Sequence, residues 1–472
     1  MPVADLTRYR AVLVSIAVLG TALAGAIAPA SAAATGAERP DHLANGLFTC
    51  STDPSAPAYV AFGVSGADSG IDLEGVPRDT DTTDYPTPTA QYQLWPVSDP
   101  TQITTYAAAE ALAGFEAPVN VPMSSLVEGQ TYAWQARTVA GSDTSPWTHT
   151  CYFSLDTTPP SAAPTITSAN YPSNGGWDQG GAPMQVTFGA DEVGDVAGYG
   201  FSWEEPIPVP RLGGTGAYGI LQKTNPWADT DSFVQAPTVG GSASLDLLPP
   251  AGAYGPLTLY VESFDRAFNA SSVTSYQVFV SSTEPTITPP ATTPAFDKKA
   301  SFTFTPNATA EAASPIVSYT VTIGAGAAHT YKADPDGSAT VSLKLDQPAN
   351  DDVTVTSTSA NGWVSDAAEQ NYYYDTTPTV SSDVYPENGF GGGVGVPGTF
   401  TFAPKVAGVV SYTYSFDYGN TETTVPADAN GDAQITWAPT GDSGLPFYDL
   451  TVYATTKDGV NLTSYDYSFM VN

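Results

Sequence analysis

A short linker sequence that occurs three times along the chain constrains the fold more than any other feature. Asp156-Thr157-Thr158-Pro159 recurs as Asp375-Thr376-Thr377-Pro378 and, more loosely, as Ser282-Thr283-Glu284-Pro285. Each copy follows an alternating, aromatic segment, and a fourth such segment runs from Tyr467 to Val471. Alternation is typical of half-buried strands, so four terminal strands with Pro-containing linkers between them predict four tandem β-domains.

Alignment of the last three units against one another extends this prediction into their interiors. Each unit has a strand with a tyrosine at the same place, namely Tyr199, Tyr319 and Tyr412, and apolar residues that keep one phase around it. The segments Val186 to Phe188, Phe302 to Phe304 and Phe400 to Phe402 also match, and two later strands recur as well. One phase of apolar residues places one face of each strand in a core. Only an Ala-rich stretch from Tyr106 to Phe115 has a helical character after residue 32.

The first unit has a different pattern, with Leu126, Gly129 and Tyr132 at the spacing L-x-x-G-x-x-Y. In sandwich domains this spacing returns a tyrosine hydroxyl to the turn before its strand, and it places Trp134 in the core. This unit resembles a fibronectin type III domain. The three later units resemble the bacterial Ig-like repeats of actinobacterial exported and surface proteins, which carry the Asp-Thr-Thr-Pro linker. The resemblance implies an all-β chain of four tandem sandwich domains.

The expected boundaries follow from the linkers and from one insertion. We expect a signal peptide at 1–32, an N-terminal linker at 33–42, a fibronectin type III-like domain at 43–156, and Ig-like domains at 157–281, 282–375 and 376–472. The interval from Trp203 to Ala243 is much longer than the corresponding intervals of the other two repeats. The sequence therefore predicts an insertion at about 206–230, and a long insertion in a compact domain is either functional or a tolerated surface excursion.

The first 32 residues have the composition of an export signal. Arg8 and Arg10 precede an apolar stretch, and Ala30-Ser31-Ala32 is a small-residue cleavage site. An uncleaved membrane anchor is the alternative reading. Cleavage would leave 47 acidic and 12 basic residues, since Asp5 and the two arginines are removed. This charge disfavours nucleic acid and anionic membranes as partners. We expect a secreted, extracellular or cell-wall-associated monomer whose mature chain does not insert into a membrane.

The two cysteines, Cys50 and Cys151, are predicted to form a disulfide, because an exported protein meets oxidising conditions. The three histidines, His42, His149 and His329, occupy no recognisable nucleophile or metalloprotease pattern. The sequence therefore predicts a protein that is not an enzyme, with neither catalytic residues nor a cofactor.

Several acidic turns are weak calcium candidates, because calcium prefers six to eight oxygen ligands. The candidate ligands are Asp79, Asp81, Asp84, Asp334, Asp336, Asp428, Asn430 and Asp432. Asp and Asn beside Gly are also ordinary turn formers, and none of these segments has the twelve-residue calcium loop with a closing Glu.

The insertion contains basic and aromatic residues that are the leading candidates for binding a partner: Arg211, Tyr218, Lys223 and Trp227. Trp177 and Phe390 recur in matching loops, which favours packing against a neighbouring domain or their own sandwich. The leading interpretation is a secreted modular protein with a structural, adhesive or spacer role. The alternatives are a glycan- or protein-binding module that uses the insertion, and an accessory part of an extracellular hydrolase system.

Overall fold

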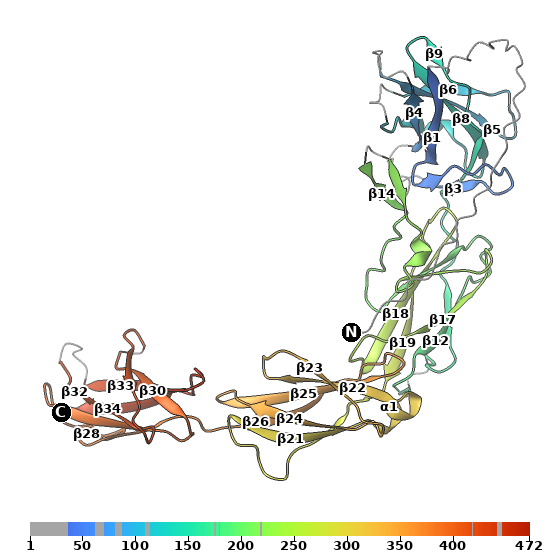
Figure 1. The fold of residues 1–472 in the computed structure, drawn as a ribbon. Coiled ribbons are helices and arrows are strands. Elements are labelled where there is room, and N and C mark those ends of the chain that lie inside the picture. Colours follow the sequence, from blue (N-terminus) through green and yellow to red (C-terminus); the bar gives the residue numbers. More distant parts are fainter. Residues whose placement is uncertain are drawn as a thin grey trace, which may run out of the picture. The chain divides into compact units, whose positions relative to one another are not determined.

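A computed structural model describes residues 36–61, 70–80, 87–108, 114–173, 176–178, 180–217, 220–417, 419–440 and 446–472. The predicted signal peptide lies outside these residues. The chain divides into two compact units whose main boundary lies between Ser154 and Leu155 (Figure 1). Each unit consists of paired β-sheets, so the predicted all-β sandwich fold is confirmed.

The first unit contains two sheets, with strand orders β2-β1-β4-β7 and β3-β10-β8-β5-β6, and β9 pairs with β8. The bounds are β1 Ala37–Asn45, β2 Phe48–Thr49, β3 Ala58–Val60, β4 Gly70–Asp79, β5 Thr89–Pro96, β6 Thr104–Ala107, β7 Val119–Pro122, η1 Met123–Ser125, β8 Thr131–Ala140, β9 Asp143–Thr144 and β10 Cys151–Leu155. The L-x-x-G-x-x-Y spacing predicted that the Tyr132 hydroxyl returns to the turn before its strand. This contact is present, because the Val127 N–H donates to the Tyr132 hydroxyl at 2.8 Å. Trp134 is fully buried, and its indole N–H donates to Asn45 Oδ1 at 2.6 Å.

The second unit contains three sandwiches with one shared topology, each pairing a three-stranded sheet with a larger one. The strand orders are β11-β12-β17 with β16-β13-β18-β19, β20-β21-β24 with β23-β22-β25-β26, and β27-β29-β32 with β28-β34-β33-β30-β31. We refer to them as the second, third and fourth domains. The short strand β28 pairs with β34 in parallel, whereas β33 pairs with β34 antiparallel.

The bounds of the second domain are β11 Thr165–Ser168, β12 Met184–Gly189, β13 Gly198–Ser202, β14 Gly213–Thr215, β15 Leu221–Lys223, η3 Pro226–Ala228, β16 Phe233–Gln235, β17 Ala243–Leu247, β18 Gly255–Phe264 and β19 Thr274–Val280. Those of the third are β20 Thr286–Thr288, β21 Lys298–Thr305, α1 Ala308–Ala313, β22 Ile316–Ile323, β23 His329–Lys332, β24 Ala339–Leu345, β25 Asn350–Ser359 and β26 Ala368–Tyr373. Those of the fourth are β27 Thr379–Ser382, β28 Phe390–Gly391, β29 Gly398–Ala403, β30 Val409–Ser415, β31 Thr423–Pro426, β32 Ala433–Trp437, β33 Phe447–Thr456 and β34 Tyr465–Val471.

The tyrosine shared by the three repeats is buried in each core and has a fixed hydrogen-bond acceptor. The hydroxyls of Tyr199, Tyr319 and Tyr412 donate to the carbonyl oxygens of Gly241, Gly337 and Gly431 at 2.6–2.7 Å. Each acceptor lies in the turn before β17, β24 or β32, respectively. A buried phenol needs such a partner, and burial raises the pKa of Tyr199 to about 12. The alignment therefore identified both the strand and its central core residue.

Three details differ from the sequence prediction. The segment predicted as the linker 33–42 is a strand from Ala37 onward, because β1 pairs with β4. A six-residue helix, α1, was not predicted; the Asn307 side chain caps it by accepting from the Thr309 and Ala310 amides. The Ala-rich stretch from Tyr106 was predicted to have helical character, but Tyr106 belongs to β6, where it pairs with Tyr92 of β5. No described helix has the length and apolar character needed to cross a membrane.

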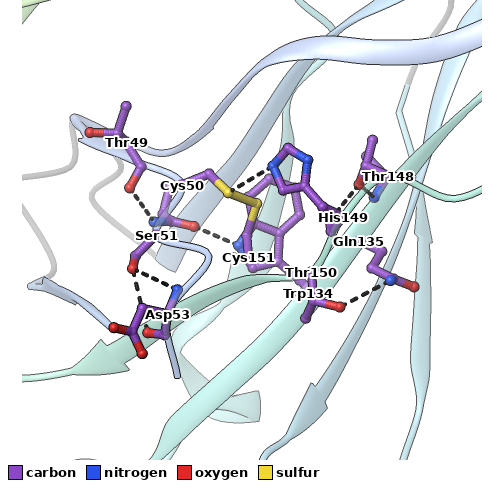
Figure 2. The surroundings of a disulfide bond; sticks show 12 residues. Thr49, Cys50, Ser51, Asp53, Trp134, Gln135, Thr148, His149, Thr150 and Cys151 are labelled. Atoms are coloured by element: carbon purple, nitrogen blue, oxygen red, sulfur yellow. Dashed lines mark hydrogen bonds between the residues drawn. A yellow bond between two sulfur atoms is a disulfide. The ribbon is translucent and has the colours of Figure 1, made fainter. Parts of the chain in front are cut away.

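The predicted disulfide between Cys50 and Cys151 is present, with the two Cα atoms 5.1 Å apart (Figure 2). It joins the segment after β2 to the first residue of β10, and an isolated bridge between Ser51 and Tyr152 lies beside it. His149 Nε2 lies 3.5 Å from Cys50 Sγ. The disulfide therefore connects the N-terminal part of the first domain to its last strand.

Candidate functional site

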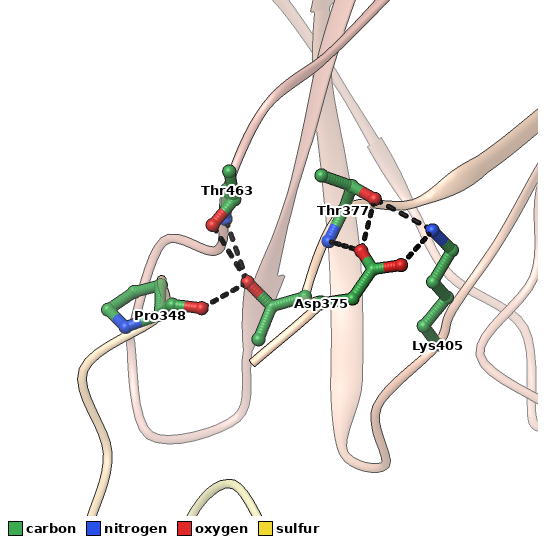
Figure 3. A network of polar contacts seen from close by, with 6 residues as sticks. Pro348, Asp375, Thr377, Lys405 and Thr463 are labelled. Carbon is green, nitrogen blue, oxygen red and sulfur yellow. Dashed lines mark hydrogen bonds and ion pairs between the residues drawn. The ribbon is translucent and has the colours of Figure 1, made fainter. Parts of the chain in front are cut away.

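The linker between the third and fourth domains is fixed by its own side chains (Figure 3). The Thr377 amide and hydroxyl donate to Asp375 Oδ1 at 3.3 and 2.6 Å, and Lys405 Nζ donates to Asp375 Oδ2 at 2.6 Å. The hydrogen bond from Lys405 is the largest effect that lowers the pKa of Asp375 below its ordinary value. The Asp of this linker copy therefore holds the threonine two positions after it.

Thr376, the next linker residue, contacts both domains that the linker joins. Its side chain is buried, and its hydroxyl donates to the Pro348 carbonyl of the third domain at 2.6 Å. The same oxygen lies 2.9 Å from the Thr463 hydroxyl of the fourth domain and accepts from the Thr463 amide at 3.2 Å. One buried hydroxyl thus connects two loops that are 115 positions apart in the sequence.

The linker between the second and third domains is held by the third domain. Asp366 accepts from the Ser282 hydroxyl at 2.6 Å and from the Thr283 amide at 2.7 Å. Thr283 is fully buried, and its hydroxyl accepts from the Trp363 indole N–H at 3.0 Å. Buried polar groups that are fully hydrogen-bonded specify one arrangement, because leaving either partner unpaired is costly.

Trp363 belongs to the third domain in sequence but packs in the core of the second. Its side chain is 2% exposed and lies in the cluster that contains Phe188 and Val280. Around it, the side-chain amide of Asn361 donates to the Gly181 carbonyl at 2.8 Å, and the backbone N–H of Gly252 donates to the Val364 carbonyl at 3.1 Å. Gly181 also lies so close to Ala310 that a side chain there would clash with the backbone of α1. The two domains therefore share a packed, hydrogen-bonded junction.

The loop that contacts a linker is the same in all three repeats. It connects the last two strands, and isolated bridges place Ala270, Val364 and Asn461 at equivalent positions in it. In the second domain this loop contacts the preceding linker through Asn269, whose amide donates to the Asp156 carbonyl at 2.9 Å. Trp363 and Asp366 do so in the third domain, and Thr463 does so in the fourth. Each repeat therefore holds the linker before it with the loop before its last strand.

Asp265 organises this loop in the second domain. Its carboxylate is buried and accepts from the amides of Ala267 and Asn269 and from the Asn269 side chain, all within 2.9 Å. Burial is the largest effect on this group and raises its pKa to about 6, although the hydrogen bonds from Asn269 oppose the rise.

We therefore expect the second domain to become more stable as the pH falls from 7 to 5. A carboxyl with a folded-state pKa near 6 and an ordinary value of 3.8 binds its proton more tightly in the folded state, so stability decreases as pH rises between these values. In Asp265→Asn this gain should become clearly smaller, because asparagine does not titrate, while burial of Glu262 and Asp178, which raises the pKa of each, leaves a remainder. Thermal unfolding followed at several pH values checks the prediction. The prediction would be contradicted if the unfolding temperature of the second domain depended on pH equally in the unaltered protein and in Asp265→Asn.

The insertion lies between β13 and β16, and its predicted binding residues do not form one exposed cluster in the part that is described. Tyr218 lies outside the described residues. Arg211 is exposed, and Lys223 ends β15. Trp227 is only half exposed: it stacks on Phe268 with a centroid separation of 5.2 Å and covers Gly198, where a side chain would clash with the indole. These contacts favour packing as the role of Trp227.

Replacing Trp227 by alanine should accordingly destabilise the second domain by about 2 kcal/mol, less than a fully buried tryptophan would. Arg211→Ala should leave stability unchanged, since an exposed side chain contributes little. Chemical denaturation of both variants measures the difference. Equal stability of the two variants would mean that Trp227 is free for another role.

The acidic loops proposed for calcium are organised as turns. Asp336 accepts from the amide and hydroxyl of Ser338, and Asp428 accepts from the amides of Asn430 and Asp432. Asp334 begins the first of these loops, Asp79 ends β4, and Asp81 and Asp84 lie outside the described residues. Among the residues described, one group of three His, Cys, Asp or Glu side chains lies close enough together to share an ion, and it consists of Cys50, His149 and Cys151. The two cysteine sulfurs of this group form the disulfide.

Comparison with known proteins adds solved structures of low similarity. No family model matches the chain, and no curated protein matches it. A tetra-tandem repeat from the extending region of a large adhesion protein is 17% identical over 88% of this chain and 98% of its own, with a TM-score of 0.22. A Ca²⁺-stabilized adhesin that helps an Antarctic bacterium bind ice is 15% identical over 88% and 96%, with a TM-score of 0.19. The FN1–FN3 domains of chicken CNTN1 are 11% identical over 64% and 94%, with a TM-score of 0.18.

Proposed function

We propose that this chain is an extracellular structural or adhesive protein in which successive β-sandwiches act as spacers with fixed junctions. The observation that carries the proposal is the contact of each repeat with the linker before it, made by Asn269, by Trp363 with Asp366, and by Thr463. A flexible tether needs no such contacts, because exposed Gly- and Ser-rich linkers reach as random coils. A spacer needs them, since it must keep the orientation of one domain relative to the next.

The disulfide supports the extracellular part of the proposal. Disulfides persist in oxidising compartments and are rare in reducing ones. The strongly acidic composition, with a net charge of −34, also suits a soluble surface outside the cell. The absence of enzymatic activity remains a prediction from the sequence.

Distance measurements between paired spin labels test the spacer proposal at the junction of the third and fourth domains. Labels at Val317→Cys and Val410→Cys occupy exposed strand positions on the two domains, while Cys50 and Cys151 remain oxidised. We expect one narrow distance distribution. In Thr376→Gly combined with Thr377→Gly the distribution should broaden, because the buried Thr376 hydroxyl and the hydrogen bond from the Thr377 hydroxyl to Asp375 are lost.

Thr436→Ser, an exposed strand substitution in the fourth domain, serves as the matched control and should leave the distribution narrow. A broad distribution in the unaltered junction would overturn the spacer proposal. Broadening in the control as well would show that the fourth domain, and not the linker, had been disturbed.

A further inference from the structure

The most exposed aromatic side chains of the described residues gather at one structural position. They are Trp177 (58% exposed), Tyr254 (58%), Tyr373 (77%), Phe390 (61%) and Phe447 (44%). Tyr254 directly precedes β18 and Phe447 begins β33, which are the second-to-last strands of their domains. Tyr373 ends the last strand of the third domain. Trp177 and Phe390 lie on segments that run parallel to the last strands, through the bridge of Asp178 with Val280 and the pairing of β28 with β34.

In the second domain these rings form a contiguous platform. Trp177 stacks on Tyr254, with a centroid separation of 5.9 Å and an interplanar angle of 26°. Trp177 also contacts Phe279 of β19, with a centroid separation of 6.0 Å and an interplanar angle of 62°. The indole is therefore held by two rings of its own domain, while more than half of Trp177 and of Tyr254 remains in solvent.

The fourth domain repeats the arrangement with different residues. Phe390 pairs with Met470, and Met470 pairs with Phe447 on its other side. Residues opposite one another in a ladder share a face of the sheet, so the two phenyl rings flank one methionine on the same face. In the third domain Tyr373 pairs with Asn350, whose amide donates to Asp352 at 3.0 Å.

This exposure is unusual for the chain. The sequence predicted that Trp177 and Phe390, because they recur, would pack against a neighbouring domain or their own sandwich. Both lie beside strands of their own domain, yet both stay more than half exposed, whereas the aromatic rings of the described chain other than these five are buried or half-buried. Single exposed apolar residues need no explanation, but a cluster at one position in successive domains marks an interaction surface.

We propose that these rings form a series of stacking platforms for an uncharged polysaccharide. A flat aromatic ring presents its face to the apolar C–H surface of a pyranose ring without losing much conformational freedom. The acidic surface of the protein disfavours polyanionic polymers. Neighbouring rings of one domain, such as Trp177 and Tyr254, can contact adjacent sugars of the same polymer, so weak individual contacts combine into useful affinity. This inference goes beyond the spacer role, because it supplies the ligand class that an adhesive protein would need.

The test uses the oxidised chain from residue 33 and two probes, insoluble cellulose and insoluble chitin, which share a β-linked pyranose backbone and differ at the acetamido group. We expect retention on at least one of them. Trp177→Ala with Tyr254→Ala, and separately Phe390→Ala with Phe447→Ala, should each weaken retention by about tenfold. Trp177→Phe should keep binding within about threefold, since it preserves a flat ring.

Val209→Ala, the loss of a highly exposed aliphatic side chain in the second domain, is the matched control and should bind like the unaltered protein. Unchanged melting temperatures show that each variant is folded. The proposal is overturned if the unaltered chain is retained on neither polymer. It is also overturned if both double variants bind as well as the control, or if Trp177→Phe loses as much as the alanine variants.

Discussion

Replacing Trp363 by alanine is expected to destabilise the second domain, although the residue lies in the third. The indole is almost completely buried among residues of the second domain and donates to the buried Thr283 hydroxyl. Removing a buried tryptophan costs about 3–5 kcal/mol through lost burial and the cavity that remains. The Thr283 hydroxyl would in addition lose the indole donor and keep only its long contact of 3.4 Å with Asp366. Calorimetry of the four-domain chain should show the unfolding transition of the second domain at a clearly lower temperature.

A matched variant separates this coupling from a general effect of losing a tryptophan. Trp437 is a tryptophan of the fourth domain that stacks on Phe416 at 4.2 Å within its own core. Trp437→Ala should lower the transition of the fourth domain and leave the second unchanged. If Trp363→Ala destabilises only the third domain, the shared core does not contribute to the stability of the second.

Reduction of the disulfide should produce the second large effect, confined to the first domain. Cys50 and Cys151 close a loop with a sequence separation of 101, for which loss of chain entropy corresponds to about 4.7 kcal/mol of stability. The remaining domains contain no cysteine, so their transitions should be unaffected. Calorimetry with and without reductant measures both effects. Titratable thiols in the denatured, unreduced protein would show that the bond does not form.

The sequence was sufficient to predict the strands of the three repeats, because alternation reports which face of a strand enters its own core. It identified Tyr199, Tyr319 and Tyr412 as core residues for that reason. The sequence pattern did not predict α1, since six residues are too few to show a helical period. Asn307, which caps this helix, is equally typical of a turn.

The contacts at the junctions could not be predicted in the same way. Trp363 lies in a polar loop with no periodicity, and the core that it enters belongs to another domain. A lone tryptophan beside Asn361 and Gly362 was the signal available, but it does not specify a partner. The rings at Trp177 and Phe390 were recognised as recurring, and Trp177 packs against Tyr254 and Phe279 of its own domain, as one of the two predicted packing modes requires. Recurrence alone does not indicate that more than half of each ring stays in solvent.

The position of Trp363 also sets an order of events during synthesis from the N-terminus. The last strand of the second domain ends at Val280, yet a residue of its core follows 83 positions later. When β19 has emerged, the second domain can pair all its strands but still has an open end in its core. It reaches its final packing only when the loop between β25 and β26 has emerged and folded, so the two domains mature as a pair.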